Sequence, residues 1–284
     1  MLVNLNDVLC DAEKHAYGVG LFNTTDTDML QAVIEAAEEL NSPVIIGTAE
    51  VLLPYGELAL IAPAMVAAAK RAKVPVVVHF DHGTTFERCM EALHLGFSSV
   101  MYDGSALPYE ENIANTAEIV RIAHAFGATV EGEIGHVGSA DAGDNDAQDM
   151  YTRVDEAKAY QDATGVDALA VSIGTAHGTY KSKPRLDFGR LAEIHAAVPV
   201  PLVLHGGSGL SDEDFKNAVA GGIRKVNIFT DLCAAGILAS KECVEKTPLP
   251  LDMHTYLGMR NHKVELMKAA VKEKILLFGS AGRA

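Results

Sequence analysis

Three histidines stand at the ends of three separate apolar segments, and glycine directly follows each of them. His82 lies in VPVVVHFDHG, His177 in ALAVSIGTAHG and His205 in VPLVLHGGSG. Three imidazoles can bind one zinc ion and leave its fourth position open, which is the arrangement of a catalytic site. A single histidine at a strand end is more often a structural residue, so the prediction of a metal-dependent enzyme depends on all three together.

A repeat of apolar β-forming segments and amphipathic helices must bring these histidines together. Eight such segments occur, at residues 19–23, 43–47, 75–80, 98–103, 128–134, 167–173, 201–205 and 224–229. Helical spacing fills the intervals, as in DMLQAVIEAAEEL, and Thr84 with Glu87 is expected to form a capping box before FERCMEALHLG. Eight units in 284 residues predict an α/β fold, a (β/α)8 TIM barrel. We expect a single domain over residues 1–284, with a C-terminal helical extension from about 250 to 284.

The composition excludes several classes of protein. The chain is 49% hydrophobic and 21% charged, which suits a folded core, and its formal net charge of −15 argues against a nucleic-acid partner. No segment reaches the roughly 18 apolar residues of a membrane span, and MLVNLNDVLCDAEKH is too polar for a signal peptide. We therefore expect a cytoplasmic protein without a membrane partner. The four cysteines include no C-x-x-C pair and are interpreted as free thiols.

In a TIM barrel the active site lies at the C-terminal ends of the strands. The residues at those positions are unusually polar: Asn23, Asp81, His82, Asp103, Glu133, His177, His205 and Asn227. An anionic substrate would be held there by backbone N–H groups of glycine-rich turns at helix starts, without a cluster of lysines.

Several longer motifs follow these positions in a fixed order. They are FDHG at 80–83, EGEIGHVG at 131–138, IGTAHGTYKSKPRLDF at 173–188, LHGGSGLSDEDF at 204–215, GIRKVNIFTDL at 222–232 and the terminal GSAGRA. With these motifs the chain resembles the class II, zinc-dependent aldolases, the fructose- and tagatose-bisphosphate aldolase family, over nearly its whole length.

The resemblance implies a reversible retro-aldol cleavage of a phosphorylated ketose to dihydroxyacetone phosphate and an aldehyde. It assigns His82, His177 and His205 as ligands of Zn²⁺, which Co²⁺ or Mn²⁺ can replace, and it places a monovalent cation, Na⁺ or K⁺, near the phosphate. Asp81 matches the aspartate that takes the proton from the C4 hydroxyl. The alternative for Asp81 is that it only orients a neighbouring group.

Glu133 matches a family glutamate near the metal that can act as an alternative ligand. For Glu133 and Asp103 we favour a role as hydrogen-bond acceptors for a histidine N–H. His79 and His136 are not expected to bind the ion.

The phosphate-binding turns of the family match glycine-rich and polar positions after strands six to eight. They are Gly178, Gly206, Gly207, Ser208, Asn227, Ile228, Phe229 and Thr230, and Asn23 is expected to contact substrate as well. The glycines also serve tight turn geometry, because positive φ and close backbone approach are needed together.

Three departures from the family pattern concern proton transfer and the distal phosphate. GSADAG stands where the family has GGEEDG, which leaves Asp141 as the nearest carboxylate for the proton on the ketone carbon. LDMHTYL replaces DPRKYL, so that His254 holds an arginine position, and TAEVLLPYG replaces a SEGA-like segment. Arg260 is a candidate compensating group.

Other functions remain as alternatives. A Schiff-base aldolase would use Lys225, and a metal-dependent hydrolase of the same fold would be expected to show a His-x-His pair where this chain has VGLFN. A third alternative is the non-catalytic partner subunit of a tagatose-type aldolase, against which the presence of Asp81 argues. The family habit suggests a homodimer or homotetramer.

Overall fold

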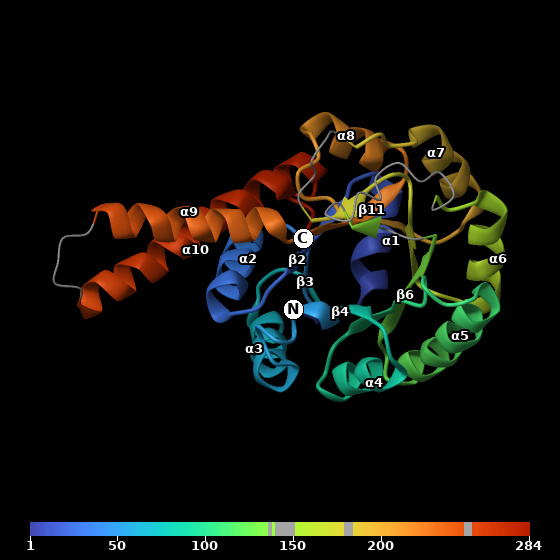
Figure 1. Cartoon of the computed structure of the whole chain (residues 1–284), viewed down its shortest axis with the longest axis horizontal. Coiled ribbons are helices and arrows are strands. Elements are labelled where there is room, and N and C mark those ends of the chain that lie inside the picture. Colours follow the sequence, from blue (N-terminus) through green and yellow to red (C-terminus); the bar gives the residue numbers. More distant parts are fainter. Residues whose placement is uncertain (136–137, 140–150, 179–183, 247–251) are drawn as a thin grey trace.

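Eight parallel strands close into a barrel in the computed structural model, which describes residues 1–135, 138–139, 151–178, 184–246 and 252–284 (Figure 1). Around the barrel each strand pairs with the next one in chain order, β11 pairs with β2, and every pairing is parallel. The barrel strands are β2 (Val19–Asn23), β3 (Val44–Ala49), β4 (Val76–Gly83), β5 (Ser99–Tyr102), β6 (Thr129–Ile134), β8 (Ala168–Val171), β10 (Leu202–Leu204) and β11 (Ile223–Ile228). The predicted TIM barrel and its eight strands are confirmed.

Helices surround the barrel because one side of each strand faces an apolar helix stripe (Figure 1). They are α2 (Thr27–Glu39), α3 (Leu58–Arg71), α4 (Phe86–His94), α5 (Tyr109–Ala125), α6 (Val154–Thr164), α7 (Phe188–Ala197) and α8 (Asp212–Ala220), with the short 3₁₀ helix η1 (Glu50–Leu52) after β3. The predicted capping box before α4 is wrong. Thr85 is the N-cap and accepts from the Arg88 N–H, because Thr84 instead donates to Glu50.

The N-terminal segment closes one end of the barrel. Strand β1 (Leu2–Val3) pairs with the start of β4, and α1 (Leu5–His15) lies in the middle of the ring in Figure 1. Leu5 and Leu9 of α1 are fully buried in one cluster with apolar side chains from inside the barrel. The N-terminal end is therefore filled with apolar side chains, and the C-terminal end holds the polar residues.

Inward-facing side chains change from apolar to polar along the strands. On β4, the alternate residues Val77, His79 and Asp81 follow one another, and all three are buried. Residues two apart in a strand point to the same side, so this order carries the ionisable groups toward the C-terminal mouth. The same spacing places Glu131 and Glu133 together on β6.

Two long helices form an arm that projects beyond the barrel (Figure 1). They are α9 (Thr230–Lys246) and α10 (Met253–Phe278), and α10 returns along α2 to the barrel. Lys268 and Lys272 of α10 form ion pairs with Glu39 of α2, which fixes the base of the arm. Among the described residues, no helix combines the length and apolarity needed to cross a membrane.

Candidate active site and metal centre

A cavity of about 640 Å³ opens at the C-terminal end of the strands. Most of the predicted site residues line it: Asn23, Asp81, His82, Glu133, Gly178, Gly206, Gly207, Ser208, Asn227, Ile228, Phe229 and Thr230. Asp103 lines it too, together with Ala49, Glu50, Val51, Leu52 and Thr84. The barrel thus brings the ends of β2, β4, β6 and β11 to one cavity.

A bulge at the end of β4 directs two consecutive side chains to this cavity. The pairing with β5 shifts between Phe80 and Gly83, and His82 has a φ of 47°, in the left-handed region. In a regular strand Asp81 and His82 would point to opposite sides, but an extra residue on one strand re-aims the chain. Positive φ is unfavourable for a non-glycine residue and is found mostly at functional sites.

Two imidazoles are each held by a carboxylate on one nitrogen. His82 Nδ1 lies 2.8 Å from Asp103 Oδ2, and His205 Nε2 lies 2.8 Å from Glu131 Oε1. Their other nitrogens, Nε2 of His82 and Nδ1 of His205, face each other at 2.8 Å. A carboxylate behind a histidine fixes its tautomer and leaves the opposite nitrogen as an electron-pair donor. This donor set fits a divalent metal ion.

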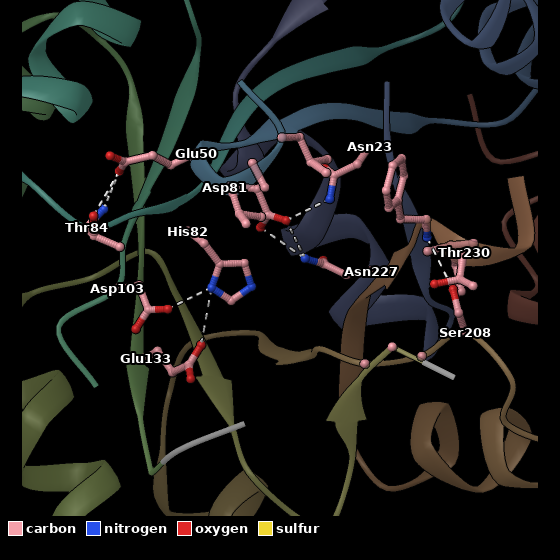
Figure 2. Close-up of a pocket in the computed structure, with 18 residues that line it drawn as sticks. Asn23, Glu50, Asp81, His82, Thr84, Asp103, Glu133, Ser208, Asn227 and Thr230 are labelled. Carbon is pink, nitrogen blue, oxygen red and sulfur yellow. Dashed lines mark hydrogen bonds and ion pairs between the residues drawn. The ribbon is translucent and has the colours of Figure 1, made fainter. Parts of the chain in front are cut away.

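Carboxylates dominate the electrostatics around His82. Burial lowers the pKa of this imidazole, but Asp81 and Asp103 outweigh burial and raise the pKa to about 9. Glu133 is buried, and its Oε2 lies 4.0 Å from His82 Nδ1 (Figure 2). The site therefore attracts positive charge, either as a proton on His82 or as a cation.

Two asparagine amides hold Asp81 (Figure 2). Asn23 Nδ2 donates to Oδ2 at 2.9 Å, and Asn227 Nδ2 lies 3.0 and 3.1 Å from the two oxygens. Burial alone would raise the pKa of Asp81, but the charges of His82 and Lys225 lower it well below its ordinary value. Asp81 is therefore an ionised carboxylate that Asn23 and Asn227 hold in a fixed orientation beside His82.

A layer of buried ionisable side chains lies beneath the site, inside the barrel. Lys225 Nζ forms an ion pair with Glu131 Oε2 at 2.7 Å, and both side chains are fully buried. His79 is in the same layer, where its Nε2 lies 3.7 Å from Glu131 Oε2. Burial and the Lys225 charge lower the pKa of His79 to about 3, so that this imidazole is neutral.

Glu131 is a residue that sequence reasoning missed. Its signal was available, because Glu131 and Glu133 are two apart in one strand and must share the inward side.

The opposite side of the cavity offers backbone and hydroxyl donors. Gly206 has a φ of 65°, and a Cβ there would clash with the carbonyl oxygen of Ala176. Ser208 Oγ accepts from the Phe229 N–H at 3.2 Å, and α9 begins at the next residue, Thr230. A helix start beside a glycine turn is a favourable place for a phosphate group.

Two predicted residues lie partly or wholly outside the described part of the chain. The backbone of His177 belongs to β9 (Ala176–His177), which pairs with β7 (Gly138–Ser139), but its side chain is not among those described. Asp141 falls outside the described residues altogether.

The residues considered for a distal phosphate do not line the cavity. Arg260 Nε pairs with Asp28 Oδ1 at 2.8 Å, and its guanidinium also donates to Gln31 at 2.9 Å, which ties the arm to α2. His254 lies in the first turn of α10.

Fold and site together define an enzyme class: a TIM barrel whose strand ends carry a histidine–carboxylate centre, a buried aspartate and a phosphate-type turn. The family model of class II fructose-bisphosphate aldolases matches residues 3–283.

Curated and solved relatives agree with the family model. Fructose-bisphosphate aldolase of Thermus caldophilus is 41% identical over the full length of both chains, and that of Staphylococcus aureus is 37% identical over 100% of this chain and 99% of its own. The crystal structure of the YdjI aldolase of Escherichia coli K12 superposes with a TM-score of 0.89 at 38% identity, with both chains covered completely.

The chain therefore belongs to the class II fructose-bisphosphate aldolase family. It is a metal-dependent aldolase, a carbon–carbon lyase that cleaves a phosphorylated ketose to dihydroxyacetone phosphate and an aldehyde.

Proposed function

We propose that this aldolase works with a zinc ion bound by His82, His177 and His205. The supporting observation is the arrangement of two of these imidazoles. Asp103 holds His82 Nδ1 and Glu131 holds His205 Nε2, while the remaining nitrogens, His82 Nε2 and His205 Nδ1, lie 2.8 Å apart. When bound, the ion supplies Lewis-acid polarisation of the ketone oxygen. Glu133, buried beside His82, is an alternative ligand to this set.

Asp81 is the proton acceptor in the cleavage direction. It takes the C4 hydroxyl proton while the C3–C4 bond breaks and the C4–O bond becomes the aldehyde carbonyl. The electron pair of the broken bond stays with the dihydroxyacetone phosphate half, which then takes a proton at C3, and Asp141 is the candidate donor. Asn23 and Asn227 hold the Asp81 carboxylate in position by three contacts of 2.9 to 3.1 Å.

The phosphate of the dihydroxyacetone half binds at the turn that carries Gly206, Gly207 and Ser208, beside the start of α9. Supporting this placement are the positive φ of Gly206 and the helix start at Thr230. Gly178 and residues 227–229 line the same cavity, and a monovalent Na⁺ or K⁺ ion near the phosphate belongs to this proposal.

Metal removal tests the proposal directly. Exhaustive chelation should abolish cleavage, and added Zn²⁺, Co²⁺ or Mn²⁺ should restore it, because nitrogen ligand sets accept several divalent ions. Circular dichroism of the chelated protein is the control for intact folding. Activity that survives chelation but is lost on borohydride treatment with substrate would overturn the metal mechanism in favour of a Schiff base at Lys225.

Homo-oligomer formation through the arm is a further part of the proposal. Large apolar side chains on α9 and α10 are exposed, including Ile237 at 68%, Val244 at 70% and Tyr256 at 64%. Exposed apolar side chains gathered on one projecting element are typical of a protein–protein contact. A second copy of this chain, as a homodimer or homotetramer, is the partner that we propose.

A further inference from the structure

The two ends of the active-site cavity differ in chemistry. Figure 2 shows Glu50 and Thr84 on one side of Asp81 and His82, and Ser208 and Thr230 on the other. The Ser208 end has the glycine turn and the helix start that suit a phosphate. If the phosphate binds at the Ser208 end and the carbon chain of the ketose passes Asp81, the aldehyde half extends toward Glu50.

The wall at the Glu50 end is apolar. Ala49, Val51 and Leu52 line it, and the Val51 side chain is 75% exposed. The remaining residue of this wall, Glu50, is anchored: its Oε2 accepts from the Thr84 N–H at 2.7 Å and from the Thr84 hydroxyl at 3.1 Å. These two donors of the loop after β4 are thus already used by a carboxylate.

The described lining of the cavity carries no lysine or arginine side chain that could hold a second phosphate at this end. Arg88 lies 3.8 Å from Glu50 Oε1 but pairs at 2.6 Å with Glu91, and it lines a separate hollow. A phosphate dianion placed here would find a carboxylate and apolar side chains instead of the charge-assisted donors that bind phosphate elsewhere.

We propose that this site selects an aldehyde half without a phosphate, so that ketose 1-phosphates are its substrates in preference to ketose 1,6-bisphosphates. The specificity-determining wall is Ala49, Val51 and Leu52, with Glu50 fixing its position against Thr84. The inference rests on the proposed function, because it uses the placement of the first phosphate at the Ser208 end.

The condensation direction gives the sharpest assay. Dihydroxyacetone phosphate is offered with glyceraldehyde or with glyceraldehyde 3-phosphate, so that the comparison does not depend on the stereochemistry at C3 and C4. For the wild-type enzyme loaded with Zn²⁺, kcat/KM for glyceraldehyde should equal or exceed that for its 3-phosphate.

A variant and a matched control locate the determinant. Val51→Lys adds a cation to the wall and should shift the ratio of the two kcat/KM values toward the phosphorylated aldehyde by roughly tenfold, the scale of one charge–charge contact near a protein surface. Leu60→Lys, on α3 and 74% exposed, adds the same charge away from the cavity and should leave the ratio unchanged.

The outcomes separate the two proposals. Zinc-dependent condensation with a wild-type preference of tenfold or more for the phosphorylated aldehyde overturns this inference and leaves the proposed function standing. If Val51→Lys folds and its ratio of the two kcat/KM values is unchanged, the assignment of the wall is overturned. If that variant does not fold, the ratio measured for the wild-type enzyme decides the inference. Zinc-independent activity, or none with either aldehyde, overturns the proposed function itself.

Discussion

At the scale of single residues, the site depends on which nitrogen of each histidine faces the cavity. His82 presents Nε2 because Asp103 holds Nδ1, whereas His205 presents Nδ1 because Glu131 holds Nε2. Each imidazole is therefore oriented by a carboxylate from another part of the barrel: Asp103 follows β5, and Glu131 lies in β6. Removal of such a partner typically costs 10- to 100-fold in metal affinity or activity.

The first residue-scale prediction concerns Asp81. Asp81→Ala should lower cleavage by roughly 10²-fold or more, the usual scale for a positioned acid or base, while zinc content stays nearly intact. Metal analysis of the purified variant and steady-state kinetics check both parts. A normal rate once zinc is restored would show that Asp81 only orients its neighbours.

The second residue-scale prediction concerns Glu131. Glu131→Gln keeps an oxygen for His205 but leaves the Lys225 ammonium buried without its carboxylate, so the free energy of unfolding should fall by about 3 kcal/mol. Adding Lys225→Met should recover most of this loss. In both variants zinc affinity should fall about tenfold, because the carboxylate behind His205 is gone.

Urea unfolding and competition with a chelator measure these two effects separately. Unchanged zinc affinity in the stable double variant would contradict the role of Glu131 behind His205.

Some residues of the site could be predicted from sequence and some could not. His82, His205 and Asn227 follow or end apolar segments, and that local pattern suffices to place them at the barrel mouth. The partner of His205 is 74 residues away along the chain, so no local pattern connects the two. The inward direction of Glu131 is readable from alternation, but its pairing with Lys225 arises only when the barrel closes.

At the scale of elements, the barrel strands could be predicted from sequence, whereas several of the elements that join or close the barrel could not. All eight barrel strands were predictable, because buried parallel strands form continuous apolar β-branched runs. The two-residue β1 and the sealing helix α1 were not, since their interactions are with the far end of the barrel. The start of α4 was misplaced because Thr84 is used by Glu50, a contact between separate loops.

The arm yields the element-scale prediction. The chain of 30.1 kDa should measure as a dimer or tetramer in size-exclusion chromatography with light scattering. Ile237→Lys combined with Tyr256→Lys should shift it toward the monomer, because two charges would be buried unpaired in the contact. Leu60→Lys, off the arm, serves as the control. A wild-type monomer at micromolar concentration would contradict the arm contact.

At the scale of the whole molecule, the barrel sorts its interior into zones along one axis. The base is apolar and is filled by α1, the middle layer is ionic, with Glu131, Lys225 and His79, and the mouth carries Asp81 and His82. Composition and strand order predict the outline of this arrangement. The ionic middle layer depends on the register between strands that are distant in sequence, which the sequence alone does not specify.

The sealing of the base by α1 has a consequence for the order in which molecules leave. One ketose enters through the mouth, and two products must depart by the same opening. In the proposed binding mode, the turn beside Ser208 holds the phosphate of the dihydroxyacetone half, whereas the aldehyde half lies against the uncharged side chains of Ala49, Val51 and Leu52. We therefore expect the aldehyde to leave first. With the ketose as the varied substrate, dihydroxyacetone phosphate should be a competitive inhibitor and the aldehyde a noncompetitive one. This is the product-inhibition pattern of ordered release from a site with one opening.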